Sequence, residues 1–549
     1  MKKVILLAVN AKYVHTSLSV RALSAGISEY AQFAYDVKII EETINRTNEE
    51  IVEAVVLHSP DIVGISAYIW NAKKLPDVIK GLKEQLPKVK IILGGPEASF
   101  NAQYWLEQGS DEVIPGEGES ALPALLDRWC HNKGLLPEAN HTENAYPSYN
   151  PETSPIDPYT DEYLKALKGR LAYIETSRGC PFSCAFCLSA GDKVRFFPLE
   201  IVKEQILKLS KSETKTIKFV DRTFNCNAER AYQILEYILS LDTNCCFHFE
   251  VAADLFNEHT ITLLKSALAG RIQLEAGLQS FFEPTVEAVT RKTSLDLAEK
   301  NIREIVLGGN IHIHVDLIAG LPYETLTEFK NSFDRAYSLK AHTLQLGFLK
   351  LLHGSKLREQ ADDLGIEYRK EAPYEIKCSP WLSAEDINTL KQAENALQHT
   401  TNKGRFLKTV DYVLAASKIR PFEFFEMLGQ AVPNHGKDLS EYATEIFSIC
   451  LTLPNVEYNK LYDCMLFDWL GMVKGKNMPY ILKTAKNNKI HSAKIAEANL
   501  GRKIRRDESG ILSTGQIIYV DSENRNPVTG LYIVDTRDNM NGLTTPLCT

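Results

Sequence analysis

Short apolar runs alternate with longer amphipathic stretches over the first 130 residues of the chain. The apolar runs, rich in valine and isoleucine, predict strands at residues 3–9, 35–42, 61–68, 89–95 and 111–116. The stretches between them have helical periodicity and predict helices at 17–33, 47–58, 72–86 and 120–132. Strands that are apolar throughout and separated by helices are typical of a parallel sheet covered on both faces. This region is therefore predicted to be a doubly wound α/β domain.

The same alternation returns after residue 170. Strands are predicted at 171–177, 217–222, 246–253, 271–280, 311–320 and 343–351. Helices are predicted at 198–210, 227–240, 257–268, 283–290, 294–307 and 325–339. Six repeats in about 180 residues fit a partial parallel (β/α)6 barrel better than a complete eightfold barrel. In such barrels the chemistry takes place on the loops that follow the strands.

The remaining segments have other patterns. Residues 136–167 are rich in Pro, Asn, Thr and Tyr without periodicity, which predicts a linker or wrapping arm. Helices are predicted at 383–400, 404–417, 421–431 and 438–451, and two strands joined by a polar turn at 510–538. We therefore expect an α/β protein with a Rossmann-like domain at 1–135, a linker at 136–167, a partial barrel at 168–365, and a mainly helical domain with a terminal β-hairpin at 366–549.

Composition narrows the functional classes. The chain has 549 residues and a formal net charge of -8, so it has no overall attraction to nucleic acid or to an anionic membrane. No window approaches 18 uninterrupted apolar residues, and the first apolar run, Val4 to Val9, is shorter than the core of a signal peptide. Eleven cysteines without an export signal indicate a reducing, cytoplasmic compartment. Most of the scattered ones, which include Cys130, Cys226 and Cys450, are expected to be small buried hydrophobes.

One local stretch departs from the overall charge. Residues 471–506 carry ten basic residues against a single acid, Glu497. The basic residues are Lys474, Lys476, Lys483, Lys486, Lys489, Lys494, Arg502, Lys503, Arg505 and Arg506. Such a stretch could contact the phosphates of a tRNA. Aromatic residues are nearly absent from it, which favours a solvated lysine-rich face over a nucleic-acid surface.

Residues 177–191, SRGCPFSCAFCLSAG, contain three cysteines in the pattern C-x₃-C-x₂-C: Cys180, Cys184 and Cys187. Their thiolates can face one metal centre only if the loop curls around it, and Gly179 and Pro181 suit such a loop. A structural zinc site needs four ligands, and no fourth ligand lies nearby in the sequence. Iron–sulfur clusters are held by cysteine thiolates, and a cubane with three protein ligands leaves one iron open to a substrate or cofactor.

This motif, with Phe186 before its last cysteine, resembles the signature of radical S-adenosylmethionine (AdoMet) enzymes, also called radical SAM enzymes. The resemblance implies that the three cysteines bind a 4Fe-4S cluster and that AdoMet chelates its open iron. An electron from an external donor of the flavodoxin or ferredoxin type would then cleave AdoMet to methionine and a 5′-deoxyadenosyl radical. A zinc-binding loop is the alternative.

Other barrel positions extend the resemblance. Asp221, at the end of the second strand, is implied to bind the AdoMet amino group. The fourth-strand segment LEAGLQS implies contacts with the ribose and carboxylate, and the glycine segment IAGLPYET a contact with adenine. The full set of implied AdoMet residues is Phe186, Asp221, Glu275, Gln279, Ser280 and Gly320. Packing inside the barrel is the alternative for each of them.

The amino-terminal region resembles the cobalamin-binding domain of a large radical AdoMet subgroup, through the order strand, loop, GISA, GGP and GEGE. The D-x-H-x-x-G motif that supplies a histidine to cobalt is absent, because His15 has neither the Asp two residues before it nor the Gly three residues after it. The cobalamin contacts implied are Asn10, Lys12, Tyr13, His15, Ser66, Tyr68, Gly94, Gly95, Glu117, Gly118 and Glu119. The alternative is a degenerate domain that only supports the barrel.

The two resemblances together imply a cobalamin-dependent enzyme that methylates an unactivated carbon. The same cofactors support other radical rearrangements, so a non-methylating enzyme with a structural cobalamin domain stays an alternative. A tRNA-modifying enzyme and a non-enzymatic cobalamin or redox sensor are further alternatives. The last 185 residues, which resemble an uncharacterised extension of one subgroup, contain no motif that identifies the substrate.

Overall fold

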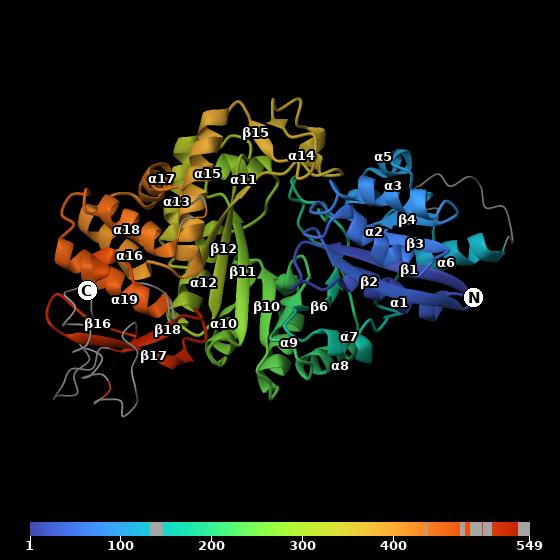
Figure 1. Ribbon diagram of the computed structural model, residues 1–549, viewed down its shortest axis with the longest axis horizontal. Helices are drawn as coiled ribbons and strands as arrows, with labels where there is room; N and C mark the ends of the chain where they lie inside the picture. The colour runs from blue at the N-terminus through green and yellow to red at the C-terminus, as the bar shows by residue number, and fades with distance from the viewer. Residues whose placement is uncertain are drawn as a thin grey trace. The chain divides into compact units, whose positions relative to one another are not determined.

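The structure is a computed structural model that describes residues 1–131, 146–433, 436, 438–472, 478–483, 497 and 508–535. The chain divides into two compact units, which are considered separately. The first unit contains residues 1–263, 287–293 and 349–380, and the second contains 264–286, 294–348 and 381–549. Figure 1 gives the labels of the helices and strands.

Residues 1–131 of the first unit form a parallel sheet with the strand order β2-β1-β3-β4-β5. The strands are β1 (Lys2–Asn10), β2 (Tyr35–Thr43), β3 (Ile62–Ser66), β4 (Lys90–Gly94) and β5 (Glu112–Ile114). The helices are α1 (Leu18–Tyr30), α2 (Asn48–Val56), α3 (Leu75–Gln85), α4 (Pro96–Ser99), α5 (Ala102–Glu107) and α6 (Gly118–His131). The strand order reverses between β1 and β3, and ligands of such sheets bind at the carboxyl edge near this point.

Strand β1 shows why this sheet is covered on both faces. Leu6 and Ala8 pack in one apolar core with residues of α1 and α6, whereas Leu7 and Val9 pack in a second core with residues of α2 and α3. Successive residues of a strand point to opposite faces, so a run that is apolar at every position is buried between two helical layers. Figure 1 shows α2 and α3 on one side of the sheet and α1 on the other.

Residues 146–265 continue the chain with three further parallel strands in the order β10-β9-β6. The strands are β6 (Ala172–Ile174), β9 (Thr216–Phe219) and β10 (Cys246–Val251), and β7 (Ser177–Arg178) pairs with β8 (Arg195–Phe196) in an antiparallel hairpin. The α-helices are α7 (Asp161–Ala166), α8 (Leu199–Ser210), α9 (Ala228–Ser240) and α10 (Glu258–Lys265). Two short 3₁₀ turns are η2 (Phe224–Cys226) and η3 (Ala253–Leu255). The β7–β8 hairpin contains the cysteine motif.

Residues 349–380 return to the first unit with α14 (Lys356–Glu359), β14 (Glu367–Tyr368) and β15 (Ile376–Cys378). The backbone N–H of Leu357 donates to the carbonyl of Ala185 at 2.8 Å, inside the cysteine loop. The hydroxyl of Tyr374 donates to the carboxylate of buried Glu97 at the start of α4. This late segment therefore contacts both the cysteine loop and the β4–α4 turn.

The second unit contains three parallel strands in the order β13-β12-β11. They are β11 (Ile272–Gln279), β12 (His312–Ala319) and β13 (Thr343–Phe348), and the helices among them are α11 (Glu283–Ala288), α12 (Leu295–Gly308) and α13 (Leu326–Tyr337). On β11 and β12 buried and partly exposed residues alternate strictly, so one face of each strand is packed and the other carries polar side chains.

The rest of the second unit is mainly helical within its described residues. Its helices are α15 (Ala384–His399), η4 (Thr401–Lys403), α16 (Leu407–Ser417), α17 (Pro421–Ala431), α18 (Leu439–Cys450), α19 (Tyr458–Met472) and η5 (Tyr480–Leu482). An antiparallel sheet follows, in the order β16-β17-β18: β16 (Ser509–Ile511), β17 (Ile517–Arg525) and β18 (Tyr532–Asp535).

The predicted α/β class, with an amino-terminal doubly wound domain, a second set of parallel strands and a helical carboxyl-terminal region, is confirmed. Helix α19 was not predicted, because its residues are buried on nearly every side and its sequence has little polar face. The predicted terminal hairpin has a third strand, β16, which pairs with β17. Part of the predicted linker forms α7, capped by Thr160. The domain boundaries stay a prediction.

Some predictions lie outside the described residues. These include residues 132–145, where the first boundary was placed, and most of the basic stretch at 471–506, with all of its ten basic residues except Lys483. Among the described residues, no helix is long and apolar enough to cross a membrane.

Candidate active site

The cysteine motif forms a loop whose two ends are drawn together. Gly179 has a φ of 95°, and a Cβ atom there would lie 2.5 Å from the carbonyl oxygen of Lys193. The backbone N–H of Cys180 donates to the carbonyl of Asp192 at 3.2 Å. Only glycine permits this close approach of the two ends, so Gly179 closes the loop around its interior.

The three thiols are shielded from solvent. Cys180 is 7% exposed and Cys184 5%, and Cys187 is partly buried. Burial raises the pKa of Cys187, and negative charge on Cys180 or Cys184 raises it further. Three thiolates are therefore unfavourable together unless a cationic centre binds them.

The spacing of the sulfur atoms distinguishes one zinc ion from a larger cluster. Among the described residues, the group whose three ligand atoms all lie within 4.8 Å of one another is Glu275, His314 and Asp316, and the cysteines do not form such a group. Thiolates on a single zinc ion, with Zn–S bonds of about 2.3 Å, would lie about 3.8 Å apart. The three sulfur atoms are therefore not all as close together as on a single zinc ion, and their assignment to an iron–sulfur cluster stays a prediction.

Three further residues lie beside the cysteines and were not predicted to act there. The hydroxyl of Thr223 is 3.7 Å from the sulfur of Cys180, and Nη1 of Arg291 donates to the sulfur of Cys184 at 3.5 Å. Burial raises the pKa of Cys226, as do the charges of Asp221 and Cys180. The sequence signal for Thr223 and Cys226 was the loop after the strand predicted at 217–222, in which Thr223 comes first and Cys226 three residues later.

Asp221 lies two residues after Phe219, the last residue of β9, and is 1% exposed. Its carboxylate accepts hydrogen bonds from the backbone N–H of Thr176 (3.1 Å), the hydroxyl of Thr176 (2.7 Å) and the hydroxyl of Ser177 (2.5 Å). Burial raises the pKa of Asp221 to about 6, against the effect of these donors. The carboxylate thus ties the end of β9 to the start of the cysteine hairpin, and its contact with AdoMet stays a prediction.

In the second unit, Ser280 is also engaged by the protein. It is 1% exposed, and its hydroxyl donates to Oε1 of Glu324 at 2.6 Å. Ser332 donates to the same oxygen at 2.7 Å. Glu324 is fully buried, and burial raises its pKa to about 7. Sequence reasoning missed Glu324, although it stands in the quoted segment IAGLPYET.

Gln279 precedes this buried group and has a φ of 70°, which is unusual for a residue other than glycine. Its Oε1 atom is buried and has no hydrogen-bond partner among the described residues. A strained backbone and an unpaired polar atom at the carboxyl end of a strand are typical of a ligand site. Gly320, at the end of β12, has a φ of 96° and is buried. Both positions fit the predicted AdoMet site.

Glu275 lies on the polar face of β11, beside β12. Its Oε2 atom is 3.7 Å from Nδ1 of His314, and Nε2 of His314 is 2.9 Å from Oδ1 of Asp316. His314 and Asp316 were not predicted to belong to the site, because a strand with alternating polar residues is equally typical of a solvated face.

At the carboxyl edge of the first sheet, Asn10 and His15 are held by hydrogen bonds. The side-chain amide of Asn10 donates to the carbonyl of His15 at 3.2 Å. Nδ1 of His15 is 2.5 Å from the hydroxyl of Tyr173 on β6. Burial lowers the pKa of His15, and the charges of Lys218, Lys12 and Arg170 lower it further. His15 is thus a neutral side chain tied to Tyr173.

The loops after β1 and β3 present aromatic rings. Tyr13 is 74% exposed, and Lys12 beside it is also exposed. The ring of Tyr68 stacks on Trp70 with centroids 4.3 Å apart and planes at 7°. Trp70 was not predicted; its indole N–H donates to the carbonyl of Val9 at 3.2 Å, and the ring remains 44% exposed. Flat apolar surface at this edge suits a macrocyclic ligand.

The turn after β4 has the geometry predicted for a ligand-cradling glycine pair. Gly95 has a φ of 99°, and a Cβ atom there would lie 2.7 Å from the carbonyl oxygen of Ala67. Ser66, directly before Ala67, is buried at the end of β3. A Cβ atom on Gly94 would meet its nearest atom, the carbonyl oxygen of Ile114, at 3.6 Å. The residues at this edge therefore fit a cobalamin, with Gly95 the position that demands glycine.

The GEGES segment begins α6 and is joined to the cysteine hairpin. Oε1 of Glu119 accepts a hydrogen bond from Nη2 of Arg178 at 2.8 Å. Glu117 pairs with Arg178 at 3.3 Å and accepts a hydrogen bond from Arg195 at 3.1 Å. A Cβ atom on Gly118 would lie 2.6 Å from the side chain of Leu23. Both carboxylates are thus engaged by arginines, and their contact with cobalamin stays a prediction.

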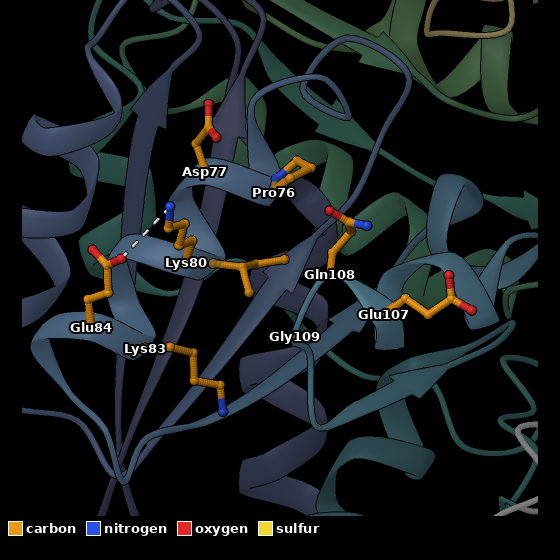
Figure 2. Close-up of a pocket in the computed structure, with 9 residues that line it drawn as sticks. Pro76, Asp77, Lys80, Lys83, Glu84, Glu107, Gln108 and Gly109 are labelled. Atoms are coloured by element: carbon orange, nitrogen blue, oxygen red, sulfur yellow. Dashed lines mark ion pairs between the residues drawn. The ribbon is translucent and has the colours of Figure 1, made fainter.

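A hollow of about 450 Å³ lies elsewhere in the first unit, between α3 and the turn after α5. Figure 2 shows its residues, including the Lys80–Glu84 ion pair on the outer face of α3. No predicted cobalamin residue lines this hollow. Its lysine Lys83 already pairs with Asp111 at 2.5 Å, so the hollow is a poor candidate for the cofactor site.

Known families match the two parts of the chain that contain the predicted cofactor residues, while the residues themselves stay predictions. Residues 4–126 match the B12 binding domain, and residues 174–336 match the radical SAM superfamily. Residues 362–517 match a protein family of unknown function, DUF4080. The cysteine loop lies within the second match, and the predicted cobalamin residues lie within the first.

Several curated relatives are similar over about half of the chain or more. An uncharacterized methyltransferase of Pyrococcus horikoshii is 28% identical over 353 residues, which are 60% of this chain and 75% of that protein. The cobalamin-dependent radical SAM methyltransferase TokK of Streptomyces tokunonensis is 25% identical over 52% of this chain. The chain covers 45% of the length of TokK.

Solved structures show the same fold. The cobalamin-dependent AdoMet radical enzyme OxsB, with aqua-cobalamin and AdoMet bound, has a TM-score of 0.61 at 14% identity and covers 85% of this chain and 78% of its own. The radical AdoMet methyltransferase TsrM of Kitasatospora setae, with cobalamin and a [4Fe-4S] cluster bound, has a TM-score of 0.54 at 16% identity and covers 68% of this chain and 79% of its own. The chain thus matches a B12 binding domain ahead of a radical SAM domain, the order that its resemblance to the cobalamin-binding radical AdoMet subgroup implied.

Proposed function

We propose that the protein is a cobalamin-dependent radical AdoMet methyltransferase that methylates an unactivated carbon of its substrate. The observation that supports this most is the direct connection between two candidate cofactor sites in one compact unit. Nη2 of Arg178, beside the cysteine loop, bonds Glu119 of the B12 binding domain at 2.8 Å. A reaction that uses both cofactors needs such a fixed relationship between them.

The relatives agree with this proposal. Several of them, among them TokK and the Pyrococcus horikoshii protein, are named as methyltransferases. The alternatives of a radical rearrangement and of tRNA modification are not favoured by these names. Most of the basic stretch that suggested tRNA lies outside the described residues.

When bound, the cluster and cobalamin would supply the reductive cleavage of AdoMet and the methyl group. The chain would hold the cluster through Cys180, Cys184 and Cys187. Asp221 would fix the strand end beside them, since its carboxylate accepts three hydrogen bonds from Thr176 and Ser177. Burial of Cys180 and Cys184 would keep water and oxygen away from reactive species.

The reaction also needs an external electron donor, and we propose a small redox protein of the flavodoxin or ferredoxin type. A reducing, cytoplasmic location suits both the donor and the cluster. All cysteines of the described residues are free thiols, which supports such a compartment.

The test is anaerobic reconstitution with iron, sulfide and hydroxocobalamin, followed by dithionite and AdoMet. We expect 5′-deoxyadenosine to form, and Cys184→Ala to abolish it while Cys450→Ala, a control at a buried cysteine of α18, leaves it unchanged. Absence of 5′-deoxyadenosine from protein that carries a full cluster would contradict the proposal. Mass spectrometry of extracts from cells with and without the protein, searched for a difference of about 14 Da, would then identify the methylated substrate.

A further inference from the structure

Arg178 stands directly before Gly179 and Cys180 and contacts three carboxylates. Its Nη2 atom lies 2.8 Å from Glu119 and 2.7 Å from Glu175, and its Nη1 atom lies 3.3 Å from Glu117. The Nε atom donates to Glu175 as well, at 3.1 Å. Every nitrogen of the guanidinium therefore faces an acid, as a planar fork of donors allows.

Aromatic rings confine the same guanidinium. Its central carbon is 5.2 Å from the ring centroid of Tyr149 and 6.0 Å from that of Phe197. The side chain of Arg178 is 19% exposed, and that of Glu119 is 8% exposed. Little water reaches these charges, so their mutual attraction is screened less than on an open surface.

Arg195, on the opposite strand of the hairpin, also pairs with Glu117 of the B12 binding domain. It is the β8 residue paired with Arg178 of β7. Nη1 of Arg195 donates to Glu117 at 3.1 Å and to the carbonyl of Tyr149 at 2.9 Å. Both ends of the cysteine loop are thus attached to the turn between β5 and α6 of the B12 binding domain.

We propose that Arg178 is a positioning residue that sets the distance between the cluster and the cobalt by fixing the cysteine loop to Glu117 and Glu119. This inference rests on the proposed function, since it requires both cofactors to bind. Lysine cannot replace Arg178, because its ammonium group has one nitrogen, whereas the guanidinium contacts three carboxylates through three nitrogens. Loss of Arg178 would leave Glu117, Glu119 and Glu175 without their shared cation, so their repulsion would loosen the attachment.

The distance can be measured without knowing the substrate. A reduced 4Fe-4S cluster and cob(II)alamin are both paramagnetic, so pulsed dipolar EPR of anaerobically reduced protein reports the distance between them and its spread. We expect one narrow distribution in the wild type and a distribution at least twofold broader in Arg178→Gln and Arg178→Lys. Arg46→Gln is the matched control, because Arg46 also pairs with two carboxylates, Glu42 and Glu50, but is 52% exposed.

Glu119→Gln keeps Arg178 paired with Glu117 and Glu175, so it provides a milder variant if Arg178→Gln does not fold or hold the cluster. A broadened distribution in Glu119→Gln, at unchanged iron and cobalamin content, supports the inference. A distribution as narrow as the wild type in Glu119→Gln and in every Arg178 variant that holds both cofactors overturns it. A wild type that lacks either paramagnetic signal would instead contradict the proposed function.

Discussion

The hydroxyl of Thr176 donates a hydrogen bond of 2.7 Å to Oδ1 of Asp221, and the backbone N–H of the same threonine donates to Oδ2 at 3.1 Å. One residue of the short connection between β6 and the cysteine hairpin therefore satisfies both oxygens of a buried acid that follows β9. The position of the hairpin thus depends on a carboxylate 45 residues further along the chain.

Asp221→Asn should lower the free energy of unfolding by about 1–3 kcal/mol, because the amide has only one acceptor oxygen for the three donors around it. Urea unfolding measures the change, and an unchanged midpoint would contradict this account. AdoMet titration of the reconstituted protein tests the predicted contact with the amino group. Thr176→Val is the comparison, because it removes one hydrogen-bond donor but keeps the carboxylate of Asp221. If Asp221 contacts AdoMet directly, Asp221→Asn should bind AdoMet more weakly than Thr176→Val does.

Each of Cys180→Ala, Cys184→Ala and Cys187→Ala should lower the iron content from about four per chain to less than one and abolish the brown absorbance. Cys226→Ser is the sharpest control, because this partly buried thiol is near enough to Cys180 to respond to its charge. We expect Cys226→Ser and Cys130→Ala to keep their iron. Iron lost from Cys226→Ser would assign that residue to the cluster, and zinc without sulfide in the wild type would exclude the cluster altogether.

Gly95→Ala should destabilise the first unit and weaken hydroxocobalamin binding. At φ 99° a side chain is strained, and its Cβ would meet the carbonyl of Ala67 at 2.7 Å, so we expect a cost of about 1–3 kcal/mol. Gly94→Ala is the matched control at the neighbouring position, where the nearest atom would be 3.6 Å away. Spectrophotometric titration compares the two affinities. Equal binding by both variants would remove the β4–α4 turn from the cofactor site.

His15→Ala should leave the absorption spectrum of bound cobalamin nearly unchanged. Nδ1 of His15 is engaged by Tyr173 at 2.5 Å, and burial lowers the pKa of His15, so the ring serves as a neutral link between the two domains. EPR of bound cob(II)alamin should accordingly show no splitting from a histidine nitrogen. Tyr173→Phe, which frees the ring, is the companion variant. A nitrogen splitting that disappears in His15→Ala would restore His15 as a cobalt ligand.

Glu324 should make stability fall as pH rises. Burial raises its pKa from 4.5 to about 7, so the folded protein binds this proton more tightly than the unfolded chain does. The favourable contribution is present below pH 4.5 and is lost as pH rises toward 7, by up to about 3 kcal/mol. The difference in unfolding free energy between Glu324→Gln and wild type should therefore grow by that amount between pH 4.5 and 8. Glu84→Gln, at an exposed glutamate, is the control. A difference in unfolding free energy between Glu324→Gln and wild type that does not change with pH would contradict burial of the Glu324 carboxyl group.

The sequence predicted those parts of the molecule that local patterns determine. Strand β12 and helix α13 were predicted within the regular succession of strand and helix patterns that resumes after residue 170. The cysteine loop was predicted because its three cysteines lie within eight consecutive residues and a glycine directly precedes the first of them. Helix α19 was missed because a segment buried on nearly all sides has no amphipathic period to detect.

The contacts between distant segments were beyond prediction. Arg178 and Glu119 are 59 positions apart, and neither residue has a local pattern that distinguishes a buried ion pair from a solvated charge. The same holds for Tyr374 and Glu97, which are 277 positions apart. Such pairs depend on how the segments pack, and single-sequence periodicity contains no information about that.

The shared guanidinium of Arg178 also has a consequence for protein engineering. A chimera that received its B12 binding domain from a distant relative would keep the sheet and the glycine turn. It would lose the ion pairs of Arg178 and Arg195 if the new domain lacked acids at the positions of Glu117 and Glu119. Grafts should therefore move Glu117 and Glu119 together with Arg178 and Arg195, and natural variation at these four positions should be concerted.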